Sequence, residues 1–233
     1  MNSKESTILY RKSGILKYLE RTPDLQIRTN MTVEWHHGDI LDLPDARYIV
    51  QQCNCLTVRA LGLAEAIARK FPRANAYGER RAVGSRNLAI VSDRSIPGSV
   101  KILPANDFLS VVCLFSQWAP GKAGASYAHK YPVSAEGSET NVLRLSWFVS
   151  ALDKLATMLS ETEHEIPPIV AFPYKIGCGL AGGSWMSYLH EIRQFSLLHK
   201  DLLRVVIVAR PQDLPVLPRD PQRGPKRKER DED

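Results

Sequence analysis

The sequence predicts an α/β protein in which helices cover both faces of a central mixed sheet. Strand-like and helix-like segments alternate from residue 32 to residue 208. Two short, largely apolar runs, 169–172 and 203–208, have the composition of buried strands, and residues 140–159 have the pattern of an amphipathic helix. Strands that alternate with helices form a sheet with helices packed on both sides. We therefore expect a three-layer α/β/α fold.

The first half of this region supplies most of the strands. The expected strands are residues 33–36, 47–53, 99–103 and 109–115, with a turn at 104–107 between the last two. Residues 61–71 have apolar side chains at helical spacing, which predicts a helix. The helix should end at Pro72, because a proline disfavours helical backbone in the residue before it. A second, polar helix is expected at 74–83.

The second half begins with a loop at 119–138 that is rich in glycine, alanine, tyrosine and proline. The helix at 140–159 that follows places its apolar side chains on one side: Val142, Leu145, Phe148, Val149, Leu152, Leu155 and Leu159. The strand at 169–172, a helix from Ser184 to about residue 198 and the last strand at 203–208 complete the pattern.

The 233 residues suffice for one domain of ordinary size with appendages. We expect the domain at 32–210, an N-terminal extension at 1–31 with a short helix at 15–20, and a disordered tail at 211–233. The tail is rich in proline and charge and contains a basic cluster at 223–230. That cluster could be a nuclear address, a nucleic-acid contact or simply a solvated segment.

Composition and charge indicate a soluble intracellular protein, cytoplasmic or nuclear. Hydrophobic residues make up 44% of the chain, and no apolar run approaches the ~20 residues that a membrane helix needs. The N-terminus lacks the pattern of a signal peptide. The net charge is +6, and only this charge and the tail point to nucleic acid. No membrane partner is expected.

A glycine-rich segment is the most informative part of the chain. The apolar run 169–172 leads into Gly177, Gly179, Gly182 and Gly183, and a helix-like segment then starts at Ser184. A strand, a glycine loop and a helix start in this order place several backbone N–H groups around one concavity, which suits a phosphate or diphosphate. The spacing fits neither the P-loop nor the dinucleotide-binding motif.

The four cysteines include no C-x-x-C pair. Cys53 and Cys55 would point to one face of a strand, and His36 and His37 could in principle complete a zinc site. The alternative is a set of reduced, partly buried thiols. We expect no metal and no cofactor.

Three motifs occur in a particular order. They are Gly38-Asp39-Ile40 after the first strand, Cys53-Asn54-Cys55 leading to Gly62-Leu63-Ala64, and Ile176-Gly177-Cys178-Gly179-Leu180 near the end. Over residues 32–208 this set resembles the macro domain, the ADP-ribose-binding α/β fold. The loop and the strand end look most like the branch of ADP-ribose 1″-phosphate phosphatases and terminal ADP-ribose protein glycohydrolases. Residues 113–116, which end in Ser116, resemble the central strand of the phosphatases.

The resemblance implies roles for individual residues. Asp39 would accept a hydrogen bond from the adenine amino group beside the backbone N–H of Ile40, and Asn54 would hold the distal ribose and orient a water. The diphosphate would be held by the helix start at Gly62, Leu63 and Ala64 and by the amides of Gly177, Cys178, Gly179 and Leu180; Ser116 completes the implied ligand-binding set. The residues alone also allow plainer roles: a turn cap at Asp39, an Asx-turn at Asn54 and a left-handed turn at the glycines.

The chain also departs from the resembling groups. Gln117 and Ala181 stand where the glycohydrolases carry the lysine and aspartate of their covalent mechanism, so that mechanism is not expected. The loop 56–61 lacks the usual glycine run; its Arg59 could contact an additional phosphate or could be a surface residue. The aromatic residue that often stacks on adenine after the last strand is absent, and Trp185 or Trp118 could substitute for it.

Two functions follow from these observations. One is binding of ADP-ribose or a derivative with hydrolysis of the 1″-phosphate or of an ADP-ribosyl linkage by water; Cys178 is the alternative nucleophile. The other is a non-catalytic module that reads ADP-ribosylated proteins.

Overall fold

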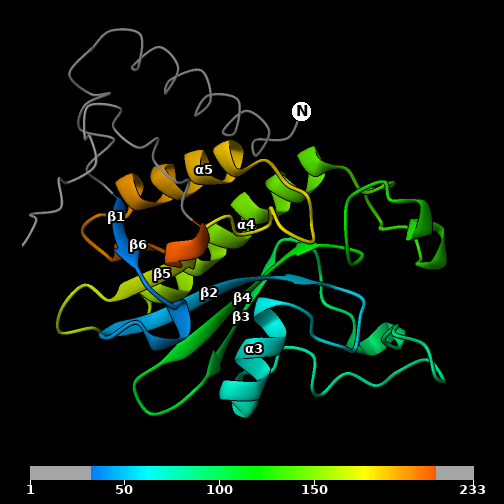
Figure 1. Cartoon of the computed structure of the whole chain (residues 1–233), viewed down its shortest axis with the longest axis horizontal. Coiled ribbons are helices and arrows are strands. Elements are labelled where there is room, and N and C mark those ends of the chain that lie inside the picture. Colours follow the sequence, from blue (N-terminus) through cyan, green and yellow to red (C-terminus); the bar gives the residue numbers. More distant parts are fainter. Residues whose placement is uncertain (1–32, 214–233) are drawn as a thin grey trace, which may run out of the picture.

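The computed structural model describes residues 33–213, which form one six-stranded sheet flanked by helices (Figure 1). The strands are β1 (Val33–His37), β2 (Ala46–Asn54), β3 (Ser99–Pro104), β4 (Ser110–Gln117), β5 (Ile169–Pro173) and β6 (Arg204–Ala209). Their order in the sheet is β1-β6-β5-β2-β4-β3. All neighbouring strands are parallel except β3 and β4, which are antiparallel. The expected mixed sheet is confirmed.

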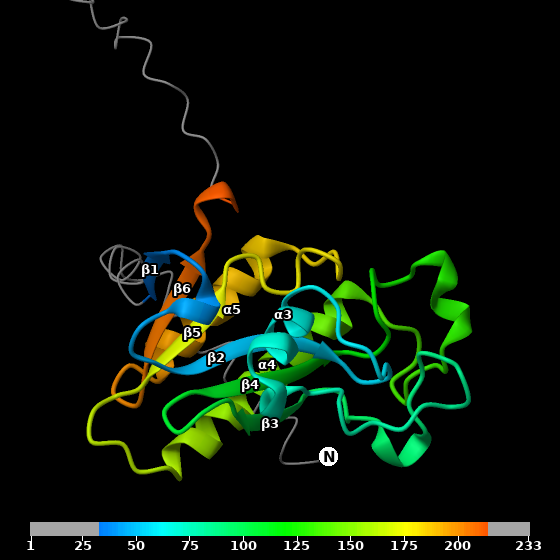
Figure 2. The ribbon, with the colours of Figure 1, turned by 60° about the horizontal axis from the view of Figure 1, so that its bottom comes forward.

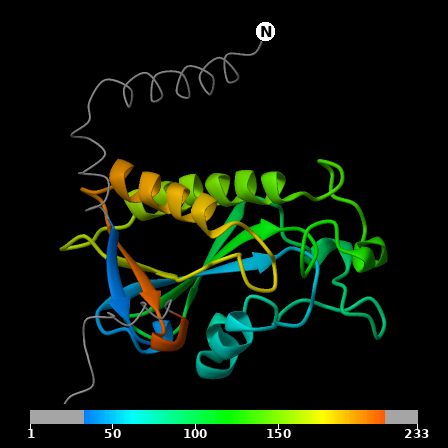
Figure 3. The same cartoon turned by 45° about the horizontal axis from the view of Figure 1, so that its top comes forward.

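The helices divide between the two faces of the sheet. Helices α4 (Asn141–Ser160) and α5 (Trp185–Leu198) pack on one face, and α3 (Leu63–Lys70) lies on the other (Figure 3). Each face has its own apolar core, one built around Phe148, Leu155 and Ile192 and the other around Ile49 and Ile67. The three-layer α/β/α architecture is therefore confirmed.

The helix expected at 74–83 is wrong. A short 3-10 turn at Pro72–Ala74 is followed by irregular turns. Tyr77 is buried, and its hydroxyl accepts a hydrogen bond from the backbone N–H of Asn54 at 3.1 Å. Arg80 donates to the carbonyl oxygens of Asn54 and Thr57 at 3.2 and 2.7 Å. These contacts with the end of β2 hold the segment in a non-helical path, so tertiary contacts override the local pattern.

The long helix α4 is confirmed, with Thr140 as its N-cap; the Thr140 hydroxyl accepts from the N–H of Leu143 at 3.1 Å. Its buried face differs from the expected one at the first turn. Val142 is 79% exposed, whereas Arg144 is 1% exposed. The arginine is drawn inward because carbonyl oxygens of two loops bind its guanidinium group.

Several sequence-based expectations fall outside the described residues: the N-terminal extension, its helix at 15–20, and the tail from residue 214 onwards. Residues Pro211–Asp213, which were assigned to the tail, form a 3-10 turn in which Arg210 pairs with Asp213. Between residues 33 and 213, no helix is long and apolar enough to cross a membrane. The same part of the chain contains no group of three or more His, Cys, Asp or Glu residues that could hold a metal ion.

Candidate functional site

A groove of two adjoining pockets lies at the carboxyl ends of the parallel strands, where ligands of such sheets bind. Figure 2 shows the loops that follow β2 and β4 at one end of the sheet. The larger pocket has a volume of about 800 Å³ and the smaller one about 350 Å³. Both are lined by the same six residues at their junction: Gly62, Leu63, Pro173, Tyr174, Arg210 and Asp213.

The groove brings together most of the residues that the sequence singled out. The larger pocket is lined by Asn54, Gly62, Leu63, Ala64, Gly177, Cys178, Gly179 and Leu180. The smaller pocket is lined by Asp39 and Ile40. Ser116 lines neither pocket: it is fully buried in β4, so we expect no direct contact between its side chain and a ligand.

The glycine-rich loop forms one wall of the larger pocket. Its backbone turns through left-handed conformations at Lys175 (φ 58°) and Gly177 (φ 72°). The N–H of Cys178 donates to the carbonyl of Lys175 at 2.9 Å, so this amide is used within the loop. The N–H groups of Gly177, Gly179 and Leu180 have no acceptor among residues 33–213. Three amides of this wall are therefore free to meet an anion.

The opposite wall starts at the end of β2. The side-chain oxygen of Asn54 accepts three hydrogen bonds, from the N–H of Leu56 (3.1 Å), the N–H of Thr57 (2.8 Å) and the hydroxyl of Thr57 (2.9 Å). The Asx-turn interpretation of Asn54 is thus confirmed. Only its NH₂ group remains for other partners, and it lies 3.4 Å from the Tyr77 hydroxyl.

The loop after this turn is held by a residue that the sequence analysis missed. The side-chain oxygen of Asn87 accepts from the N–H groups of Val58 and Arg59 at 3.1 and 3.0 Å. Asn87 and Arg59 both line the larger pocket, and Arg59 is exposed. The loop 56–61, which has no glycine run, is therefore fixed through a distant asparagine.

The smaller pocket combines a carboxylate with an ion pair. The Asp39 carboxylate accepts from the N–H of Leu41 at 2.9 Å and caps the 3-10 turn at Ile40–Asp42. Arg210 forms two hydrogen bonds with the Asp213 carboxylate, at 2.7 and 3.2 Å. The Arg210 guanidinium, through these bonds, keeps the pKa of the Asp213 carboxyl below its usual range.

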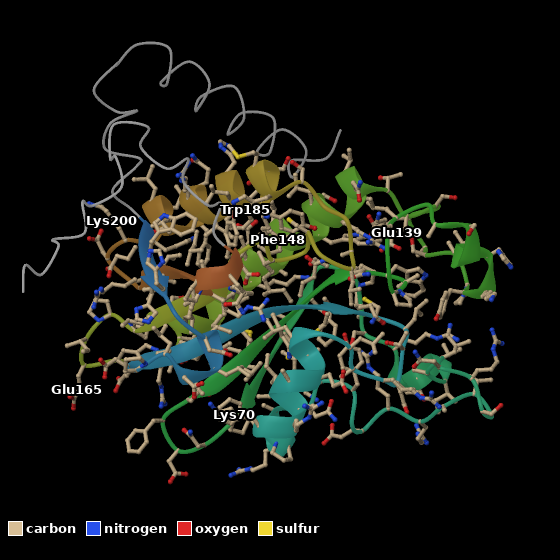
Figure 4. The ribbon with its side chains drawn as sticks, viewed as in Figure 1. Lys70, Glu139, Phe148, Glu165, Trp185 and Lys200 are labelled. Carbon is tan, nitrogen blue, oxygen red and sulfur yellow. The ribbon has the colours of Figure 1, made fainter. Side chains whose placement is uncertain are left out.

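An aromatic residue that the sequence analysis missed lies where the two pockets join. Tyr174 lines both pockets, and its ring packs against Trp185 (centroids 5.1 Å apart) and Trp35 (6.0 Å). Trp185, at the start of α5 in Figure 4, lines neither pocket. Trp118 also lies outside them and donates its ring N–H to the carbonyl of Pro132 at 2.6 Å. Tyr174 is therefore the aromatic side chain at the junction, and its position directly after the strand–proline sequence could have identified it.

The thiols near the groove are not activated. Burial raises the pKa of Cys178 to about 11 and that of Cys55 to about 12. The Cys178 thiol donates to the carbonyl of Ile176 at 3.2 Å. Burial also raises the pKa of the Tyr77 hydroxyl. At neutral pH these groups are protonated, and a neutral thiol is a weak nucleophile.

The positions that differ from the glycohydrolase group hold structural residues. The side-chain NH₂ of Gln117 donates to the carbonyl oxygens of Ala119 and Gly121 at 2.9 and 3.0 Å. Ala181 is buried, and its carbonyl accepts from Arg144 at 3.0 Å. Neither position offers a group for acid–base or covalent chemistry.

No protein-family model and no curated protein matches the sequence. Solved structures do match the fold. A protein of unknown function from Bacteroides thetaiotaomicron has a TM-score of 0.54 and 18% identity, covering 76% of this chain and 97% of that one. The Oceanobacillus iheyensis macrodomain with MES bound has a TM-score of 0.51 and 16% identity, covering 78% and 85%. A point mutant of that macrodomain with ADPR has a TM-score of 0.48 and 14% identity, covering 78% and 87%. At these identities the likeness concerns the fold alone, and the chain has the fold of a macrodomain.

Proposed function

We propose that the groove binds ADP-ribose or a close derivative. The observation that carries this proposal is the set of three amides without a protein acceptor, at Gly177, Gly179 and Leu180, in residues that line the larger pocket together with the start of helix α3. Both features attract a diphosphate without a charged side chain. The Oceanobacillus iheyensis macrodomain, which shares this fold, has been solved with ADPR bound in a mutant form.

The proposed pose places the base in the smaller pocket and the distal ribose in the larger one. One oxygen of Asp39 caps its own turn, which leaves the other to accept from the adenine amino group. Tyr174 and the guanidinium plane of Arg210 line the junction and offer flat surfaces for the base. The diphosphate then lies at the glycine loop, and the distal ribose approaches the NH₂ of Asn54.

A non-catalytic ADP-ribose-binding module agrees best with the chemistry of the larger pocket. Cys178 is protonated at neutral pH, and the Asn54 oxygen is already occupied by three donors. Gln117 and Ala181 serve the loop structure. The partner that we propose is therefore an ADP-ribosylated protein that is bound and not processed.

The second candidate is hydrolysis of a phosphate monoester on the distal ribose, as in the ADP-ribose 1″-phosphate phosphatases. The exposed guanidinium of Arg59 in the larger pocket favours it, since arginine binds phosphate through paired N–H groups. In this reaction a water oxygen would bond to phosphorus, the bond from phosphorus to the 1″ oxygen would break, and ADP-ribose and inorganic phosphate would be released.

One experiment separates these functions. The protein is incubated with ADP-ribose 1″-phosphate, with free ADP-ribose and with an ADP-ribosylated protein, and the products are analysed by mass spectrometry. Binding is measured in parallel by thermal unfolding, because a ligand at ~100 times its dissociation constant adds ~2.7 kcal/mol of stability. Stabilisation by ADP-ribose without turnover supports the binding module, and phosphate release supports the second candidate. An unchanged melting temperature in millimolar ADP-ribose contradicts both.

A further inference from the structure

A buried arginine connects the glycine-rich loop to the loop that follows β4. Arg144, in the first turn of α4, is 1% exposed. One of its terminal nitrogens donates to two carbonyl oxygens, those of Gly121 (2.6 Å) and Ala181 (3.0 Å). The other donates to the carbonyl of Ala119 (3.2 Å) and to the carboxylate of Glu139 (2.8 Å). Figure 4 shows Glu139 close to the start of α4.

The two carbonyls that share one nitrogen belong to two different loops that line the larger pocket. Gly121 lies in the loop that follows β4, and Ala181 lies in the glycine-rich loop. Because one nitrogen atom holds both oxygens, their separation is limited by two hydrogen-bond lengths. The distance between the glycine-rich loop and the loop after β4 therefore depends on Arg144.

Glu139 and Gln117 complete this network from the other side. The Glu139 carboxylate accepts from the N–H groups of Trp118 and Ala119. The side chain of Gln117 donates to the carbonyls of Ala119 and Gly121. The loop after β4 thus has both its N–H and C=O groups held, and Arg144 extends these contacts to the glycine-rich loop.

The stability of the fold does not explain why an arginine occupies this buried position. A buried ion pair pays a desolvation cost that a well-packed apolar side chain avoids. The Nε atom of Arg144 is also buried without a hydrogen-bond partner among the described residues, which adds to the cost. What an apolar side chain could not do is bind two carbonyl oxygens from different loops at once.

We propose that Arg144 is a positioning residue. It sets the distance between the glycine-rich loop and the loop after β4, and thereby holds the glycine-rich loop where it can bind a diphosphate. This inference rests on the proposed function, because it assumes that the diphosphate meets the free amides of Gly179 and Leu180. Arg144 touches no ligand in this arrangement. It acts through the carbonyl of Ala181, which directly follows these amides in the chain.

The test compares Arg144→Lys and Arg144→Met with a matched control, Glu136→Ala. Lysine keeps the charge but has one nitrogen where arginine has a fork, so it cannot reproduce all four contacts. Methionine removes all four contacts. If the methionine variant fails to fold, the lysine variant alone still tests the proposal. The control removes the hydrogen bond from the Trp147 ring to Glu136 (2.8 Å), which also joins α4 to the preceding loop but involves no pocket-lining residue.

The first readout needs no ligand. Cys178 lies inside the glycine-rich loop and is half-buried, whereas Cys53, Cys55 and Cys113 are fully buried and act as internal references. We expect both Arg144 variants to increase the rate at which iodoacetamide alkylates Cys178 severalfold, and the control to leave it unchanged. An unchanged rate in a folded Arg144→Lys variant overturns the inference, even if the wild-type protein binds no ADP-ribose.

The second readout is affinity measured by calorimetry. Arg144→Lys should bind ADP-ribose about tenfold more weakly, as expected when a hydrogen-bonded loop is released. Its affinity for AMP, which lacks the second phosphate and the distal ribose, should stay within about twofold of wild type. Equal losses for both ligands would mean general destabilisation and overturn the proposal. Failure of wild type to bind ADP-ribose would count against the proposed function, while the alkylation result still decides the role of Arg144.

Discussion

The side-chain oxygen of Gln52 lies beside Gly177, 2.3 Å from the place where a β-carbon at that position would stand. The ring of Tyr188 lies 2.9 Å from the same place. Side chains of strand β2 and helix α5 thus pack against the glycine-rich loop and leave no room for a side chain at Gly177. The left-handed backbone at Gly177 adds a second, independent requirement for glycine.

Gly177→Ala should therefore destabilise the protein and abolish binding of ADP-ribose. The left-handed conformation alone costs an L-residue ~1–2 kcal/mol, and the clash with Gln52 must also shift the loop. Gly179→Ala is the matched control, because a β-carbon there meets nothing within 4 Å. We expect its stability to stay within ~0.5 kcal/mol of wild type. Urea denaturation measures the stability of both variants, and titration with ADP-ribose measures their binding. Normal binding by Gly177→Ala would refute the argument that a side chain at this position displaces the loop.

Substitutions of Asn54 should separate its structural role from its role toward a ligand. Asn54→Ala leaves three donors of the following loop without their acceptor, at a cost of ~1–3 kcal/mol for each buried group that stays unpaired. Asn54→Asp keeps the acceptor oxygens and removes only the NH₂ group. We expect the alanine variant to unfold at clearly lower urea concentration than the aspartate variant.

Both variants should bind ADP-ribose weakly, the aspartate variant because it loses the donor and adds negative charge near the diphosphate. If Asn54→Asp binds normally, Asn54 has no contact with the ligand and only shapes the loop.

Asp39→Asn should weaken recognition of adenine without affecting the fold. Asparagine caps a helical turn as well as aspartate does, so the bond to the N–H of Leu41 is retained and stability should change by less than ~0.5 kcal/mol. The other carboxylate oxygen is replaced by an NH₂ group. This group and the adenine amino group are both donors, so they cannot form a hydrogen bond with each other. Affinity for ADP-ribose should fall about tenfold, the usual order for one lost hydrogen bond to a charged group.

An analogue whose base is hypoxanthine tests the same position in the opposite sense, because it carries a carbonyl oxygen in place of the amino group. Asp39→Asn should lose much less affinity for this analogue than for ADP-ribose. Equal losses for both bases would place the base elsewhere in the groove.

The layers of the fold were predictable from the sequence because each strand and helix carries its own periodic pattern. The apolar runs before the glycine loop and at the end of the domain became β5 and β6, two neighbouring interior strands of the sheet. The segment 74–83 shows where this approach fails. Its structure depends on Tyr77 and Arg80 binding the end of β2, and contacts between residues more than twenty positions apart leave no local signal.

The candidate site was predictable only where one continuous motif builds it. The glycine-rich loop and the helix start at Gly62 are such motifs, and both line the larger pocket. Asn87, which holds the loop of Arg59, comes from a segment without any recognisable pattern. Tyr174 and Arg210 meet at the groove because β5 and β6 are neighbours in the sheet, which requires knowledge of the strand order.

Alkylation of Cys178 should depend strongly on pH. Burial raises the pKa of this thiol to about 11, so only about a thousandth of it is thiolate at pH 8. The rate of reaction with iodoacetamide should rise roughly tenfold per pH unit from pH 8 to about pH 10 and level off above pH 11, because the thiolate is the reactive form. Since the pKa is higher in the folded than in the unfolded state, the neutral thiol favours the fold, and this contribution is lost as the pH rises through 11. Mass spectrometry of quenched samples measures the profile, and the same chain in denaturant gives the profile of an ordinary thiol. Rapid alkylation of the native protein at pH 7 would restore Cys178 as a candidate nucleophile and weigh against the binding-module proposal.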